Sequence, residues 1–482
     1  WSAPHMSPRI SLLFWLCAAA PAFAQPAPRA PAPRTPAPRA PAPRPAAAAA
    51  PDDLAGFEHD LDSVFTSGGL TADQAAARAG AVSPTVHRRV AELDAAVAQL
   101  EAAELARVPL VSARASYTRL SHIDPPMFAG MTLGKALDNA YLAEAQLVVP
   151  LSDYLLRFPG LVGAARLGAE SARIGKRASE VGAGQDARLA YYEWVRARLQ
   201  VLIAQRQLIQ VQRTLDQVRA LAEVQRLSKA DLMRVESQAA EADQVVAQLQ
   251  YLALLREEQL RLLIGAPASE AIAIGEDVRP DVPVAAVAPL DELVGTARRQ
   301  RLEFKQLDTG IQAKESQRDA EQANLLPRLS AVGIADYADP NQRVFPQADE
   351  FKLTWQVGAQ LTWTINDALI AGTSRRRIHA EANELRADRE NLEHGTRLEV
   401  LAAQQAVALA QHSLATTQKG LAAAEESYRV RKELLNAERA TALELVDAET
   451  ELTRARIAAL NARVDLRVAR AQLDHAVGND AR

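Results

Sequence analysis

The distribution of proline is the feature that most limits how this chain can fold. Thirteen of its 26 prolines lie in the first 51 residues, and none lies between 160 and 266 or between 347 and 482. Proline fixes φ and lacks a backbone donor, so helix interiors exclude it. Aromatic residues make up only 5% of the chain. The two proline-free runs therefore predict very long helices and argue against a set of compact domains with large aromatic cores.

The first residues have the layout of a secretory signal peptide. Arg9 precedes an apolar stretch from Ile10 to Ala20, and Ala22-Phe23-Ala24 forms a small-x-small cleavage site. We expect a signal peptide over 1–24 and a Pro/Ala/Arg-rich linker over 25–51, whose repeats favour polyproline II. The single cysteine, Cys17, would leave with the signal, so the mature chain would carry no disulfide and no thiolate nucleophile. Large apolar residues precede Cys17, which argues against a lipoprotein.

The charge balance excludes one class of partner. From residue 51 onward the chain has 50 basic and 59 acidic residues, so its body is acidic and we expect no nucleic acid partner. The expected mature chain has no run of 18 apolar residues, which is the length that a transmembrane helix needs. If the protein enters a membrane, it must do so with strands.

The chain also contains an internal repeat. Residues 230–265 align without a gap with residues 443–478, at an offset of 213, and leucine and alanine recur in both at seven-residue spacing. Such a seam is typical of closely packed, coiled-coil helices. The pattern predicts a first structural repeat over 70–265, an irregular connecting segment over 266–290 and a second repeat over 291–478.

One stretch alternates with a period of two. Residues 351–365 read FKLTWQVGAQLTWTI. Its apolar positions are Phe351, Leu353, Trp355, Val357, Ala359, Leu361, Trp363 and Ile365. Fifteen alternating residues predict a strand, and the length, the export signal and the tryptophan near one end favour a lipid-facing strand over the strand of a soluble sandwich, which also alternates.

The sequence predicts four such strands, at about 109–120, 141–151, 328–338 and 351–365. A membrane sheet must close because its open edges find no partner in lipid, and the smallest common closed barrel has about eight strands. One chain is therefore too small, and several copies must share one barrel. Long helices at about 159–224 and 368–436, each followed by a helix about half as long, predict the wall of a hollow helical cylinder.

The residues at this point resemble a known family. The opening LTADQAAARAGAVSPTV (70–86), the stretch LTWTINDALIAGTSRRRIHAEA (361–382) and the segment AEESYRVRKELLNAERATALELVDAETEL (424–452) are similar to the TolC-like outer-membrane efflux proteins. The resemblance implies a homotrimer with one 12-stranded β-barrel, four strands from each chain, continuous with a long periplasmic α-helical barrel. It implies an exit duct in the outer membrane of a Gram-negative bacterium, served by a periplasmic adaptor and an inner-membrane transporter.

The resemblance also implies two sites at the periplasmic tip. A ring of acidic residues would narrow the pore at Glu444 and Asp447, with Asp231 as the first-repeat partner of Glu444, although ordinary solvated charges of a coiled coil would look the same. Relatives often have glycine in the tip turns, where this chain has Gln225 and Glu438. The contact for the adaptor would comprise Gln225, Arg226, Leu227, Ser228, Lys229, Glu438 and Arg439.

Two other classes of function stay open from the sequence. A type I protein secretion system uses the same kind of duct. A periplasmic coiled-coil adaptor or scaffold would explain the signal and the heptads, but not the alternating stretch. The eight histidines are scattered, and we find no catalytic, cofactor-binding or metal-binding motif, so we expect no enzyme and no cofactor.

Overall fold

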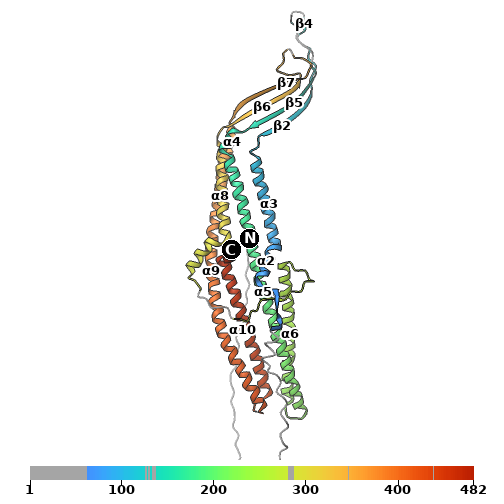
Figure 1. Cartoon of the computed structure of the whole chain (residues 1–482), viewed down its shortest axis with the longest axis vertical. Coiled ribbons are helices and arrows are strands. Elements are labelled where there is room, and N and C mark those ends of the chain that lie inside the picture. Colours follow the sequence, from blue (N-terminus) through green and yellow to red (C-terminus); the bar gives the residue numbers. More distant parts are fainter. Residues whose placement is uncertain are drawn as a thin grey trace, which may run out of the picture. The chain divides into compact units, whose positions relative to one another are not determined.

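A computed structural model describes residues 62–124, 127–128, 131–132, 137–280, 287–345, 347–437 and 439–481. The predicted signal peptide and linker lie outside the described residues. The part from Asp53 to Arg482 forms one compact unit. Its secondary structure is mostly helical, with a small antiparallel sheet (Figure 1).

Two very long helices occupy the proline-free runs, as predicted. They are α5 (Phe158–Glu223) and α9 (Ile365–Asn436), of 66 and 72 residues. At 1.5 Å per residue each is about 100 Å long. Each continues through a tight turn into a 36-residue helix, α6 (Lys229–Ile264) or α10 (Ala442–Val477). The helices α3 (Pro84–Leu105) and α8 (Leu302–Gln322) precede the strands. Proline occurs only near the start of α3 and α5, where its missing N–H has no intrahelical acceptor to lose.

The main sheet has four antiparallel strands in the order β2-β5-β6-β7. The strands are β2 (Leu110–Arg119), β5 (Asn139–Val149), β6 (Arg328–Asp339) and β7 (Lys352–Thr362). In Figure 1 they lie together at one end of the helices. A small hairpin of β3 (Met127–Phe128) and β4 (Met131–Thr132), which the sequence did not predict, lies between β2 and β5 along the chain.

The predicted strand ends need correction at two places. The fourth strand was expected to reach Ile365, but β7 ends at Thr362 and α9 begins at Ile365. Thr364 is the extended N-cap of α9, and Asp367 in the first turn complements the helix dipole. The three residues after Thr362 continue the alternating pattern, but they belong to the start of a helix. The second strand was expected to reach Leu151, which instead begins the short helix α4 (Leu151–Leu156).

The register of the sheet sorts its side chains onto two faces. Partners in adjacent strands share a face, and successive residues of one strand alternate between faces. We call one face the apolar face; it includes Val111, Ala113, Ala115, Tyr117, Tyr141, Ala143, Ala145, Leu147, Val149, Leu329, Ala331, Gly333, Ala335, Tyr337, Leu353, Trp355, Val357, Ala359 and Leu361, and polar residues join it only at the end away from the helices, at Arg119, Asn139 and Asp339. We call the other the polar face; it includes Ser112, Arg114, Glu144, Gln146, Asp336, Thr354, Gln356, Gln360 and Thr362.

Segments distant in sequence meet beside the middle of α5. The strand β1 (Phe65–Leu70) pairs with the connecting segment: Leu70 N–H donates to the carbonyl of Ala273, and Gly275 N–H donates to that of Leu70, each at 2.8 Å. A Cβ on Gly275 would lie 2.1 Å from the carbonyl oxygen of Gly69, so the two chains approach this closely only with glycine at the crossing.

A core at this level joins the two halves of the chain. Its largest buried side chains are Trp194 and Tyr191 of α5, which pack with α2 (Ala72–Val82), with the end of α6 and with Leu460 and Val464 of α10. Burial raises the pKa of the Tyr191 and Tyr192 hydroxyl groups, so both stay neutral. Because α5 and α10 belong to different predicted repeats, this core fixes the two helical pairs against each other.

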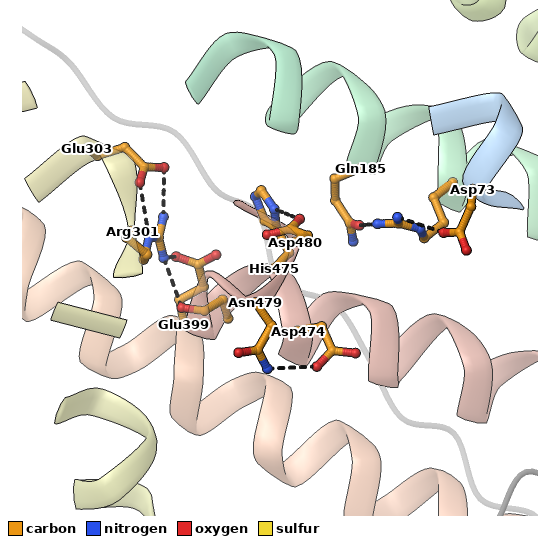
Figure 2. Close-up of polar contacts among 11 residues, drawn as sticks. Asp73, Gln185, Arg301, Glu303, Glu399, Asp474, His475, Asn479 and Asp480 are labelled. Carbon is orange, nitrogen blue, oxygen red and sulfur yellow. Dashed lines mark hydrogen bonds and ion pairs between the residues drawn. The ribbon is translucent and has the colours of Figure 1, made fainter. Parts of the chain in front are cut away.

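A buried polar network fixes the C-terminal end of α10 (Figure 2). Arg301 lies between α7 (Leu290–Gln300) and α8, and its side chain is only 9% exposed. Its guanidinium donates to Glu303, to Glu399 of α9 and to the carbonyl of Ala476 in the last turn of α10. A cation at these carbonyls complements the helix dipole. Arg301 therefore links α8, α9 and α10 at one point.

The same helix end carries a histidine–carboxylate pair. His475 Nδ1 donates to Oδ2 of Asp480 at 2.7 Å, and Asp480 belongs to the short 3-10 turn η2 (Asn479–Ala481). The hydrogen bond that His475 donates to Asp480 is the largest influence on the pKa of His475 and raises it, against the lowering effects of burial and of Arg301. Glu399 adds a smaller raising effect. The charged form of His475 is therefore favoured in the folded chain.

This pair makes the end of α10 sensitive to pH. A raised folded-state pKa gives stability that is complete below the unfolded value of about 6.5 and is lost as the pH rises through the folded value. We expect deuterium uptake in residues 470–480, corrected for the intrinsic exchange rate, to increase from pH 6 to pH 9. A hydrogen bond to a charged group contributes about 1.5–3 kcal/mol, which sets the scale of the change.

His475→Gln and Asp480→Asn are the matched variants. Both should exchange faster than the wild type at pH 6 and show little further change by pH 9. A wild-type pH response that persists unchanged in His475→Gln would contradict this role.

Candidate functional site

The turn between α5 and α6 reverses the chain at the end opposite to the sheet. Gln225 adopts a left-handed conformation with φ of 57°, which is uncommon for a residue other than glycine. The Gln225 N–H donates to the carbonyl of Ala222 at 3.0 Å, and the Arg226 N–H donates to that of Leu221 at 2.9 Å. These two bonds form a Schellman motif, which satisfies the last carbonyls of α5. The turn that glycine often makes in the resembled family is thus made here with glutamine.

The turn between α9 and α10 repeats this geometry at an offset of 213. The Arg439 N–H donates to the carbonyl of Leu434 at 2.8 Å, which corresponds to the Arg226–Leu221 bond. Glu438, the counterpart of Gln225, lies outside the described residues. The two tips therefore share the bond that closes the turn.

The helices that follow begin with equivalent caps. Ser228 Oγ accepts the N–H of Asp231 at 3.1 Å, and Thr441 Oγ1 accepts the N–H of Glu444 at 3.2 Å. In both helices the acidic residue lies in the first turn, where it complements the helix dipole. A structural role in starting the helix is thus common to Asp231 and Glu444.

The acidic residues predicted for the tip differ in their surroundings. The side chains of Glu444 and Asp447 are exposed. Arg431 of α9 lies 3.6 Å from Glu444, and both side chains are more than 40% exposed. Asp447 has no ion-pair partner among the described residues. The position equivalent to Arg431 in the first half is Val218, which is buried, so Asp231 has no such partner there and instead accepts the Ser228 hydroxyl.

The other predicted tip residues divide into exposed and packed groups. Gln225, Arg226, Lys229 and Arg439 are exposed, whereas Leu227 packs against the small core of Leu215, Val218 and Val235. The sequence prediction missed Arg431 and the ion pair between Arg219 and Glu236 at 3.1 Å, which joins α5 to α6. Both lie at heptad positions across a helical hairpin, and that spacing could have identified them.

Most of the predicted lipid-facing residues share the apolar face of the sheet. Leu353, Trp355, Val357 and Leu361 are there and are 68% to 76% exposed. Phe351 precedes β7, while Trp363 and Ile365 follow it; all three are exposed. No described segment covers this face.

Aromatic rings gather at the end of the sheet away from the helices. Tyr117 and Tyr141 are 5.1 Å apart between ring centroids, Tyr141 and Phe351 are 5.8 Å apart, and Phe351 stacks on Tyr337 at 5.0 Å. Trp363 lies at the opposite end of β7. Aromatic rings at both ends of an apolar strand face are typical of a sheet that meets two membrane–water interfaces.

Away from the tip and the sheet, polar groups that line a cavity are paired with one another. A cavity of about 660 Å³ between α5, α10 and the connecting segment is lined by paired groups: Arg188 with Asp73 at 2.9 Å, and the Tyr192 hydroxyl with Glu276 at 3.1 Å. Within the described ranges no three His, Cys, Asp or Glu side chains cluster so that they could hold a metal ion. None of the described helices has an apolar stretch long enough to cross a bilayer.

Comparison with known proteins agrees with this architecture. Residues 293–479 match the family described as outer membrane efflux protein. None of the curated proteins gives a significant match. Among solved structures, the Campylobacter jejuni CmeC outer membrane channel resembles this chain with a TM-score of 0.70 and 13% sequence identity. The alignment covers 88% of this chain and 87% of the CmeC chain.

Two further solved structures share the fold. The outer-membrane channel OprN is similar with a TM-score of 0.68 at 18% identity, over 90% of this chain and 97% of that one. CusC, whose structures concern conformational changes that accompany folding and transmembrane channel formation, resembles this chain with a TM-score of 0.70 and 16% sequence identity. The alignment covers 86% of this chain and 93% of the CusC chain. Residues 293–479 thus match the outer membrane efflux protein family, and the chain shares the TolC-like fold of these solved outer-membrane channels.

Proposed function

We propose that this protein is the outer-membrane exit duct of a tripartite efflux pump, a passive conduit from the periplasm to the exterior. A homotrimer would form one 12-stranded barrel from three four-stranded sheets, and the helices would form a periplasmic tunnel. A periplasmic adaptor would connect the duct to an inner-membrane transporter, which supplies the energy.

The uncovered apolar face of the sheet carries this proposal. That face carries no charged or amide side chain along the four strands except at the end away from the helices, where Arg119, Asn139 and Asp339 lie. Exposure of so large an apolar patch to water is unfavourable, whereas the hydrocarbon of a bilayer would cover it. The 10 to 12 residues of each strand match the 9 to 11 that a tilted membrane strand needs.

The opposite face fits a water-filled lumen. Arg114 and Glu144 lie 3.6 Å apart on neighbouring strands, and the hydroxyl or amide side chains of Ser112, Gln146, Thr354, Gln356 and Gln360 share their face, together with the apolar Leu142, Val332 and Ile334. The alternative from another class of function is an isolated periplasmic adaptor or scaffold. Such a protein would not require a sheet with one apolar face that suits lipid. Type I secretion would use the same sheet and tunnel, and no feature of the described residues favours it over efflux.

We assign the periplasmic constriction to Asp447 and Glu444, with Asp231 nearby in the first half. Three-fold rings of carboxylates in a narrow aqueous pore concentrate cations. The adaptor would contact the two tip turns, at Gln225 to Lys229 and at Glu438 and Arg439; of these, Gln225, Arg226, Ser228, Lys229 and Arg439 are exposed.

The lipid-facing side can be tested by one charge on each face. Val357→Arg, at the middle of β7, should cost about 2–4 kcal/mol because it buries a guanidinium near the bilayer midplane. Gln360→Arg places the same charge on the polar face and should have little effect. Heat-resistant oligomer after detergent extraction is the readout, and equal yields of the two variants would contradict the assignment of the faces.

The acidic constriction can be tested by ion selectivity. Replacing Glu444 and Asp447 together by serine should lower the cation-to-anion permeability ratio in planar bilayers. Asp447→Ser alone should act more strongly than Glu444→Ser, because Arg431 already compensates part of the Glu444 charge. Glu426→Ser is the control. It removes a carboxylate that pairs with Arg429 in α9, before Arg431 in the chain. Unchanged selectivity in the double variant would reject the ring.

A further inference from the structure

The segment that follows β6, residues 340–345, folds back onto the sheet. Asn341 Nδ2 donates to the carbonyl of Lys352 at 2.9 Å and to the hydroxyl of Thr354 at 3.1 Å. Asn341 Oδ1 accepts the N–H of Arg343 at 3.0 Å, and Asn341 is only 4% exposed. We call residues 340–345 the return segment. It is held by side-chain bonds to β7.

The return segment lies on the polar face. Arg343 Nη1 donates to the carbonyl of Trp355 at 2.8 Å, and its Nη2 donates to Oε1 of Gln356. Thr354 and Gln356 belong to the polar face, whereas the side chain of Trp355 is on the other side of the strand. The side-chain contacts of Asn341 and Arg343 therefore lie on one side of the sheet only.

The charge of Arg343 has no acidic partner among the described residues. Its side-chain contacts are a carbonyl and an amide, both neutral. Other cations near this end of the sheet are compensated: Arg119 contacts Asp138 at 3.3 Å, and Lys352 contacts Glu350 at 2.8 Å. Arg343 is also exposed, so its guanidinium contributes a positive charge to the space that the polar face borders, whereas the nearest acidic residue of that face, Asp336 of β6, is half-buried.

We propose that the return segment lies in the channel lumen at the outer end of the barrel, and that Arg343 sets the charge selectivity of the exit. This inference rests on the proposed function, because it requires the polar face to line a lumen. Three copies would place three guanidinium groups around the exit. This ring disfavours cations and favours anions, opposite in sign to the acidic ring proposed at the periplasmic tip.

The size of the effect follows from screened Coulomb interactions. Three unit charges each about 10 Å from the pore axis, in about 0.1 M salt with a Debye length of about 10 Å, change the cation-to-anion ratio by roughly two- to five-fold. The effect should shrink at about 1 M salt, where the Debye length is about 3 Å.

The test uses the full-length protein inserted into planar bilayers, with reversal potentials measured in a potassium chloride gradient near 0.1 M. Arg343→Gln should raise the cation-to-anion permeability ratio by roughly two- to five-fold. Arg343→Lys keeps the charge and should stay close to the wild type. Arg119→Gln is the matched control, since it removes a guanidinium at the same end of the sheet but on the apolar-face side of β2.

A second variant keeps the test decisive if Arg343→Gln fails to assemble. Gln342→Cys leaves the contacts of Arg343 in place, and the only native cysteine is Cys17. After insertion, a positively charged thiol reagent should lower the cation-to-anion ratio and a negatively charged one should raise it.

The outcomes separate this inference from the proposed function. An open channel whose selectivity is unchanged by Arg343→Gln, or by both reagents on Gln342→Cys, would overturn the inference and leave the duct intact. Equal shifts in Arg119→Gln and Arg343→Gln would also overturn it. A wild-type protein that forms no conducting channel would contradict the proposed function itself.

Discussion

The two free edges of the four-stranded sheet impose the constraint on which the rest of this architecture depends. In the order β2-β5-β6-β7, each of β2 and β7 has hydrogen-bonding groups on one side that no described strand satisfies. In hydrocarbon an unsatisfied backbone group costs several kcal/mol, so an open edge cannot persist there. The lipid environment that we propose for the apolar face therefore requires both edges to pair. The proposed oligomer follows from this requirement, since β7 of one copy can pair with β2 of the next.

The positions of the strands also constrain the long helices that follow them. The strands run directly into long helices, with β7 separated from α9 by only two residues and β5 from α5 by the short α4. The position of each sheet therefore fixes the start of its helices. Farther along, the core around Trp194 and the Arg301 network join the α5–α6 and α9–α10 pairs to their neighbours. The proposed constriction at Asp447 and Glu444 thus lies near the start of α10, a helix whose C-terminal end is held by the Arg301 network.

The sequence was most informative where one physical rule acts alone. Proline exclusion predicted α5 and α9 to within a few residues, and period-two alternation predicted the strands because one face of the sheet is apolar over most of its length. It was least informative where two elements share a boundary: Trp363 and Ile365 continue the apolar pattern, yet Thr364 caps a helix. The pairing of β1 with residues 273–275 depends on a close approach of Gly69 and Gly275 that no periodicity reveals.

The candidate site shows the same division. The offset of 213 placed Asp231 and Glu444 at equivalent helix starts, and the shared turn bonds and caps support our inference that the two halves arose by duplication. The offset could not give the difference between the halves, because Arg431 faces Glu444 where the first half has Val218. Nor could it place Arg343, since residues 340–345 follow no repeat and their position depends on side-chain bonds to β7. Residues without an equivalent in the other repeat, such as Arg431 and Arg343, are the positions at which function can change most readily while the duplicated fold is kept.

The number of chains in the membrane-extracted complex tests the central claim most directly. Two copies would supply eight strands and three would supply twelve; the resemblance to the outer membrane efflux proteins favours three. Native mass measurement of the detergent-solubilised protein should give a complex of three chains that loses no mass on dilution. A stable monomer would contradict the account, because a single chain leaves both edges of its sheet without partners.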